Sequence, residues 1–171
     1  MTLIGIDFET ANSARNSACQ IGIVVFEKGR VVDQYVSLIK PPGEFGVIQM
    51  SIHGITPSRV AKAPTLASIW PHVSALLARG KRIVAHNAAF DRSVLVASLA
   101  HHGIAAPSID FECTVAMARK RLPELPNHRL PTVCAALGIQ FVNHHDALAD
   151  AMATAKVAWA LETRTQPTGK H

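Results

Sequence analysis

Four acidic residues stand at the ends of predicted secondary-structure elements that are far apart in the sequence. Asp7 and Glu9 close the apolar segment TLIGIDFE and, two positions apart, they would share one face of a strand, with Phe8 on the other. Asp91 and Asp150 each fall four residues after a polar residue that could begin a helix. The helix dipole favours an aspartate in a first turn, and for either residue alone that structural role is the simpler interpretation.

Together, the four carboxylates suit a hard divalent cation. Oxygen ligands select Mg²⁺ or Mn²⁺ over zinc, and the sequence contains no competing cluster of histidine and cysteine. Four negative charges in one place would be costly without cations, so the pattern favours a metal site over a carboxylate acid–base pair. Two such ions about 4 Å apart can clamp the attacking and the leaving oxygen of a phosphoryl displacement.

Apolar patterning indicates the elements that must position these residues. Apolar, β-branched runs predict strands at 2–9, 18–27, 30–39 and 82–85, with a hairpin turn at Lys28-Gly29. Apolar residues at helical spacing predict helices at 66–77, 88–102, 114–121, 130–137 and 148–159. Residues 40–63, rich in glycine and proline, predict a long loop and a short helix beginning near Thr56-Pro57.

The order of elements predicts the fold class. A strand, a hairpin, a helix, a strand, a helix, a short strand and further helices indicate an α/β fold. Its sheet would have five strands, an antiparallel meander plus parallel strands, with helices on both faces. This is the three-layer architecture of ribonuclease H-like proteins. We expect one domain at residues 1–162 and a short polar tail at 163–171.

The composition is that of a globular protein. Hydrophobic residues make up 49% of the 171 residues and charged residues 17%. No apolar run reaches the roughly 18 residues of a membrane span, and the three cysteines lack metal-like spacing, so we expect a reduced, cytoplasmic protein without a membrane partner. The net charge of +5 agrees with a polyanionic partner, more so if the acids gather at one site.

Three segments resemble the exonuclease motifs of the DEDD superfamily. They are DFET (7–10), HNAAFD (86–91) and HHDALADA (144–151), and they occur in the family's order. His145 lies five residues before Asp150, the pattern of the histidine branch, and the single tyrosine, Tyr35, lies in the predicted hairpin. From residue 3 to about 160 the chain therefore resembles the DnaQ-like DEDDh 3′–5′ exonucleases, which include the epsilon subunit of bacterial DNA polymerase III.

The resemblance implies a role for each of five residues. Asp7, Glu9, Asp91 and Asp150 would hold two Mg²⁺ or Mn²⁺ ions, with Asp7 bridging and Asp91 acting partly through water. His145 would be the general base that deprotonates the attacking water. A histidine with an ordinary pKa near 6.5 is mostly neutral at cellular pH and can take that proton. A nucleoside 5′-monophosphate would then leave from the 3′ end.

Substrate contacts are expected from two segments that resemble the family. The backbone at Phe8 and Thr10 would meet the terminal nucleotide. Ile52 and His53, in the segment IHGIT (52–56) that resembles the family's substrate loop, would wedge against the last bases. Phe90 could stack on a base, although its helical spacing favours a place in the core.

Other polar residues near the motifs have structural interpretations. Asp146 is expected to cap the last helix, and His144 to be a neighbouring loop histidine outside the site. His86 and Asn87 would order the turn from strand to helix, with Asn87 as the N-cap. The basic residues at 119–121 and 128–129 either contact phosphates or form a solvated charged surface.

The expected activity is a metal-dependent 3′–5′ exonuclease acting on single-stranded or frayed DNA ends. An exoribonuclease that trims RNA 3′ ends or degrades short oligoribonucleotides is the alternative, because we identify no residue that reads the 2′-hydroxyl. A non-catalytic nucleic-acid-binding relative is a third interpretation. Since only a short polar tail follows the last helix, we expect a stand-alone nuclease rather than one stably tethered to a polymerase.

Overall fold

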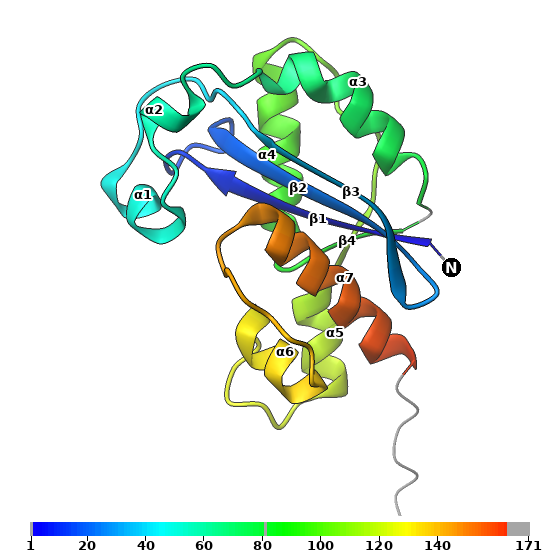
Figure 1. Cartoon of the computed structure of the whole chain (residues 1–171). Helices are drawn as coiled ribbons and strands as arrows, with labels where there is room; N and C mark the ends of the chain where they lie inside the picture. The colour runs from blue at the N-terminus through cyan, green and yellow to red at the C-terminus, as the bar shows by residue number, and fades with distance from the viewer. Residues whose placement is uncertain (1, 81, 164–171) are drawn as a thin grey trace, which may run out of the picture.

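A five-stranded mixed sheet lies at the centre of the computed structural model, which describes residues 2–80 and 82–163 (Figure 1). The strands are β1 (Thr2–Thr10), β2 (Ala18–Glu27), β3 (Arg30–Leu38), β4 (Arg82–Ala85) and β5 (Phe111–Cys113). Their order is β3-β2-β1-β4-β5. The β1, β2 and β3 strands form an antiparallel meander, whereas β4 runs parallel to β1 and β5 parallel to β4. The sheet predicted from the sequence is confirmed.

The turn between β2 and β3 has the conformation that the sequence suggested. Lys28 and Gly29 both have positive φ angles, 48° and 84°. Two-residue hairpin turns of this left-handed kind match the twist of the strands they join. The last two strands of the meander are therefore joined by a tight hairpin whose turn is encoded locally.

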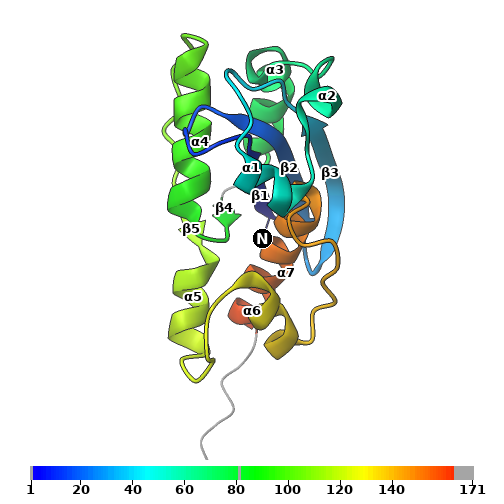
Figure 2. The ribbon, with the colours of Figure 1, turned by 90° about the vertical axis from the view of Figure 1, so that its left-hand side faces the viewer.

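Seven helices are assigned within the described residues, and they cover both faces of the sheet. They are α1 (Val47–His53), α2 (Pro57–Val60), α3 (Leu66–Leu77), α4 (Ala88–His101), α5 (Thr114–Arg121), α6 (Leu130–Leu137) and α7 (Ala147–Thr163). Figure 1 shows α3 and α4 on one face and α7 on the other. The α5 and α6 helices pack against α7 (Figure 2). Residues 164–171 of the expected polar tail lie outside the described residues.

The α1 helix lies in a segment that the sequence predicted to be loop. None of its residues is buried, and Val47, Ile48 and Ile52 are exposed. A seven-residue helix without a buried stripe has no apolar periodicity to reveal it. The prediction of a continuous loop here was wrong, and the short helix at Pro57 was confirmed.

The α7 helix lies directly against the sheet backbone. A Cβ atom on Gly5 would come within 2.3 Å of the Ala151 carbonyl oxygen, and one on Gly22 within 2.2 Å of the Ala147 carbonyl oxygen. Such distances exclude any side chain at these positions without movement of the helix. Glycine in two neighbouring strands and alanine in the helix therefore determine how closely α7 approaches β1 and β2.

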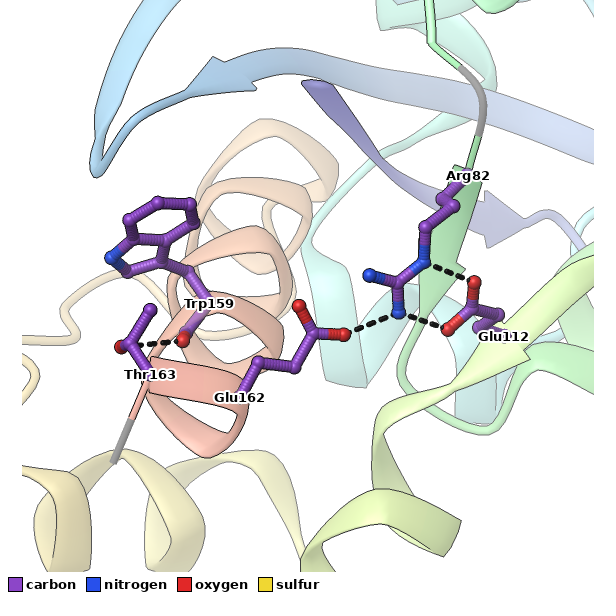
Figure 3. A network of polar contacts seen from close by, with 5 residues as sticks. All are labelled: Arg82, Glu112, Trp159, Glu162 and Thr163. Atoms are coloured by element: carbon purple, nitrogen blue, oxygen red, sulfur yellow. Dashed lines mark hydrogen bonds and ion pairs between the residues drawn. The ribbon is translucent and has the colours of Figure 1, made fainter. Parts of the chain in front are cut away.

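Ion pairs hold the C-terminal end of α7 against the sheet. Arg82 of β4 pairs with Glu112 of β5 and with Glu162 of α7, so one guanidinium joins two strands and a helix (Figure 3). The hydroxyl of Thr163 donates to the Trp159 carbonyl oxygen at 2.8 Å in the same turn.

Every helix among residues 2–80 and 82–163 is too short or too polar to cross a membrane.

Candidate active site

Three carboxylates from two distant segments meet at the end of β1. Asp7 and Glu9 project from the strand toward α7, whereas Phe8, only 3% exposed, packs into the core beneath α3 and α4. Asp150, in the first turn of α7, faces the pair. One oxygen from each of the three carboxylates lies within 4.8 Å of the other two. This grouping agrees with the same-face spacing of Asp7 and Glu9 in the sequence.

Asp91 lies beside this group, in the first turn of α4. Its side chain is almost fully buried, at 1% exposure, and its Oδ1 accepts a hydrogen bond from the backbone N–H of Phe8 at 3.1 Å. It does not belong to the group of three within 4.8 Å. The bond fixes the second motif against the first, because it joins the start of α4 to the end of β1.

Burial is the main cause that raises the pKa of each of the four carboxylates. Burial is the largest cause for Asp7, whose pKa lies well above its usual range, and the charges of Asp91, Asp150 and Glu9 add to the shift. Burial and the same kind of repulsion raise the pKa of Glu9 to about 8. Burial also raises that of Asp91 to about 8, although the bond from Phe8 opposes the shift. Contacts with the described residues leave these pKa values raised, and this set of oxygen donors fits a divalent cation.

The start of α7 is fixed by two polar side chains. Asp146 Oδ1 accepts from the backbone N–H of Ala149 at 3.1 Å, which confirms the predicted cap. Gln20 of β2 adds a second tie, because its Oε1 accepts from the Ala147 N–H at 3.2 Å and its Nε2 donates to Asp146 Oδ2 at 3.4 Å. Sequence reasoning missed Gln20, although a lone amide in the apolar strand ACQIGIVVFE was a signal.

Both histidines of the third motif lie next to Asp150. Asn143 and His145 have positive φ angles, 60° and 71°, and they bend the loop before α7. The His144 ring stacks on the His145 ring with 3.7 Å between centroids, and Nδ1 of His144 lies 3.1 Å from Asp150 Oδ2. The interpretation of His144 as a residue outside the site was wrong. Burial, and then the neighbouring His144 and His53, lower the pKa of His145, so it is neutral at pH 7.

His86 joins three segments behind the carboxylates. Its Nε2 donates to the His128 carbonyl oxygen at 3.0 Å, and its Nδ1 lies 2.9 Å from the Thr114 hydroxyl. Burial lowers its pKa to about 4, so the ring is neutral and Nδ1 accepts from Thr114. His86 therefore orders the turn after β4, as expected. Asn87 occupies the N-cap position with φ of 71° and no capping hydrogen bond, so its predicted cap was wrong.

Only some of the residues expected to contact the substrate line the cleft that contains the carboxylates. Phe8 and Phe90 line a cleft that also contains the carboxylates. Thr10 and His53 do not line this cleft, and Nε2 of His53 donates to the Thr10 carbonyl oxygen at 3.1 Å. Nδ1 of His53 accepts from the Ile55 N–H at 3.0 Å, so both ring nitrogens already bind the protein backbone. Ile52 is exposed on α1.

The cleft has a volume of about 550 Å³ and carries opposite charges. Asp7, Glu9 and Asp150 contribute to its lining, as do Arg119 and Arg129. Phe90 is half-buried, packs against the core and also faces the cleft, so both interpretations of this residue hold in part. The Arg15 guanidinium lies 4.7 Å from the centre of its ring.

Comparisons with known proteins agree with this geometry. The chain matches the family model RNase_T, described as exonuclease, over residues 4–158. It is 31% identical over 165 residues to DNA polymerase III PolC-type of Oceanobacillus iheyensis, and 34% identical over 161 residues to that of Thermotoga maritima. These alignments cover 95% and 91% of the chain but only 12% and 11% of the relatives, so the chain spans about a tenth of their length.

Two solved structures extend the comparison. Exonuclease X in complex with 5′ overhanging duplex DNA is 26% identical, with a TM-score of 0.75, over 93% of this chain and 90% of that one. The zinc-bound complex of E. coli exonuclease I with single-stranded DNA is 23% identical, with a TM-score of 0.80, over 95% of this chain and 41% of that one. At this identity, the second likeness shows the shared fold.

Proposed function

The chain belongs to the DnaQ-like family of 3′–5′ exonucleases, and on that premise we propose that it removes nucleotides from DNA 3′ ends with two divalent cations and His145 as the general base. The exonuclease domain would comprise residues 1–162. Single-stranded or frayed ends would be the substrates, and nucleoside 5′-monophosphates the products. The three unpaired cysteines suit the reducing cytoplasm in which we place the protein.

The grouping of Asp7, Glu9 and Asp150 is the observation that carries this proposal. Their oxygens lie within 4.8 Å of one another, and the buried Asp91 adds a fourth charge beside them. Such a set favours Mg²⁺ or Mn²⁺, because these ions prefer carboxylate oxygens. When bound, the two ions would supply the positive charge that offsets the carboxylates and the phosphate under attack.

His145 has the properties that a general base requires. It is neutral at pH 7, because burial and two neighbouring histidines lower its pKa. The stacked ring of His144 and the left-handed backbone at residue 145 orient it. His145 takes the proton of the water that attacks the terminal phosphodiester.

We propose DNA as the substrate because two groups of similar proteins, a solved exonuclease and a set of polymerases, are associated with DNA. Exonuclease X, which the chain covers almost completely, is bound to duplex DNA in its solved structure. The polymerases that share the domain are named as DNA polymerases. The chain matches only about a tenth of the length of those polymerases, so the proposal concerns nuclease activity alone.

A panel of matched oligonucleotides tests the substrate. DNA, RNA and a DNA duplex with a mismatched 3′ end, each labelled at the 5′ end, are incubated with the protein and Mg²⁺. We expect the single-stranded and mismatched DNA to shorten one nucleotide at a time and faster than RNA. Faster shortening of the RNA would overturn the choice of DNA and support an exoribonuclease.

A further inference from the structure

Two arginines without a side-chain partner among the described residues line the same cleft as the carboxylates. Arg119 lies in the last turn of α5, and Arg129 occupies the N-cap position of α6. Both are exposed and both line the cleft that contains Asp7, Glu9 and Asp150. Neither guanidinium makes an ion pair with any residue that the structure describes. Their positive charge is therefore available to a ligand in the cleft.

Asn127 adds a neutral donor to the same lining. Its Oδ1 accepts from the backbone N–H of Arg129 at 3.1 Å and from the Thr132 hydroxyl at 2.8 Å. The side-chain oxygen is thus occupied by the start of α6. The amide NH₂ has no partner among the described residues, so what Asn127 offers the cleft is a hydrogen-bond donor.

The loop that carries these donors is held in place from two sides. Nε2 of His128 donates to the Leu122 carbonyl oxygen at 2.9 Å, which ties the loop to the end of α5. The His128 carbonyl oxygen accepts from Nε2 of His86 at 3.0 Å, which ties it to the end of β4. Donors that are fixed before a ligand arrives lose less conformational entropy on binding.

The chemistry of this surface matches a phosphate. Guanidinium groups bind phosphate oxygens through paired N–H donors, and donors alone make up the set. Aromatic residues are only 5% of the chain, so a broad platform for stacking bases is lacking and the strand must be held chiefly by its backbone. The proposed cations would offset the carboxylates and the phosphate under attack, so other phosphates of the strand need positive side chains of their own.

We propose that Arg119, Asn127 and Arg129 form a phosphate-binding wall that holds the strand under degradation on the 5′ side of the scissile bond. The proposal rests on the proposed exonuclease function, and it assigns these cleft-lining residues to the phosphates that are not cleaved. The proposal also gives different roles to the three consecutive basic residues in the last turn of α5. Arg119 would serve binding, whereas Lys120 and Arg121 are exposed and do not line the cleft.

The test compares two double variants with the same change in charge. R119Q/R129Q removes the wall's guanidinium groups, and K120Q/R121Q is the matched control. Each is assayed on a single-stranded oligodeoxynucleotide and on the p-nitrophenyl ester of thymidine 5′-monophosphate, which has no phosphate beyond the reacting one. We expect R119Q/R129Q to lower kcat/KM on the oligonucleotide by about 10–100-fold, mainly through KM, and to leave the ester unaffected. The control should retain both activities.

Salt dependence gives an independent measure. The slope of log binding constant against log salt concentration should become shallower by about 1.4 in R119Q/R129Q, since each lost contact with a single strand contributes about 0.7. Fluorescence anisotropy of a labelled oligonucleotide without divalent cations measures this without turnover. It therefore tests the wall even if the protein hydrolyses neither substrate, an outcome that would overturn the proposed function alone.

Three outcomes would overturn the wall. An equal loss of binding in K120Q/R121Q would show that only overall charge matters. A parallel loss on the ester would place the arginines at the reacting phosphate. In a further assay on a duplex with a recessed 3′ end, a loss confined to that duplex would assign the arginines to the complementary strand instead.

Discussion

Nδ1 of His144 lies 3.1 Å from Oδ2 of Asp150, while the ring of the same residue stacks on His145 at 3.7 Å between centroids. Asp150 also lies within the group formed with Asp7 and Glu9. One loop histidine therefore contacts both the proposed general base and a proposed metal ligand. Adjacent histidines would then have separate roles, proton transfer for His145 and positioning for His144.

Substitution of each histidine should separate these roles. His145→Ala should lower kcat by about 10²–10⁴, the usual contribution of a general base, with the Mg²⁺ requirement unchanged. His144→Ala should mainly raise the Mg²⁺ concentration needed for half-maximal rate, by about 10–100-fold, because a ligand loses its hydrogen-bonding partner. The His144→Asn variant retains a hydrogen-bond donor, so its Mg²⁺ requirement should lie between those of wild type and His144→Ala. Steady-state kinetics over a Mg²⁺ titration measures both, and an unimpaired His145→Ala enzyme would refute the base assignment.

Stability without metal should depend on pH through Glu9 and Asp91. Their folded pKa values of about 8 lie above the ordinary 4.5 and 3.8, so the fold prefers them protonated. Their contribution to stability is full below the ordinary values and is lost as the pH rises through 8. Mg²⁺ requires the ionised carboxylates, so the rise in Tm on adding Mg²⁺ should grow between pH 5.5 and pH 8.5.

Glu9→Gln is the control for this pH dependence. Without metal, its Tm should increase relative to wild type as the pH rises, because one repelling charge is absent. Differential scanning calorimetry at a series of pH values measures the difference. A constant difference across the range would contradict the raised pKa of Glu9.

Gly22→Ala should displace α7. The new Cβ would lie 2.2 Å from the Ala147 carbonyl oxygen, so the helix must move away from β2 at the end that carries Asp150. Overpacking of this kind destabilises by about 1–3 kcal/mol or more, and we expect activity to fall in the folded fraction as well. Gly103→Ala is the comparison, because Gly103 has φ of 69° but open space around it. The Gly103→Ala variant should have a free energy of unfolding about 1 kcal/mol lower, because of backbone strain, and should keep its activity. Urea unfolding and rate measurements would show both.

Arg82→Met should weaken the attachment of α7 at its other end. The substitution leaves Glu112 and Glu162 without their shared cation, which should lower the free energy of unfolding by about 1–3 kcal/mol. Arg82 holds the pKa of Glu112 below its usual 4.5, so this contribution is present above pH 4.5 and is lost as the pH falls through the lower folded value. Urea unfolding should show that acid dependence in wild type and a weaker one in the variant.

The sequence was most informative where a local rule decides the structure. Spacing two apart in a strand placed Asp7 and Glu9 on one face, and the Lys28-Gly29 pair predicted the hairpin. Asp146 was recognised as a cap from its position before a helical pattern. Each of these outcomes depends on a few neighbouring residues, and tertiary contacts did not override them.

Features that depend on distant contacts or unusual backbone were missed. The place of His144 depends on two left-handed residues in the loop, which sequence spacing does not reveal. Gln20 acquires its role only when α7 packs across β2, 127 positions away from its partner Ala147. Asn87 is a common N-cap residue, but its own left-handed backbone prevents the capping bond.

The most direct measurement follows a 5′-labelled single-stranded DNA oligonucleotide incubated with Mg²⁺ and either wild type or Asp150→Asn. The account predicts a ladder that shortens from the 3′ end by one nucleotide at a time with wild type, and no ladder with Asp150→Asn or after chelation of Mg²⁺. An undiminished ladder with Asp150→Asn, or immediate release of the labelled 5′ nucleotide by wild type, would contradict it.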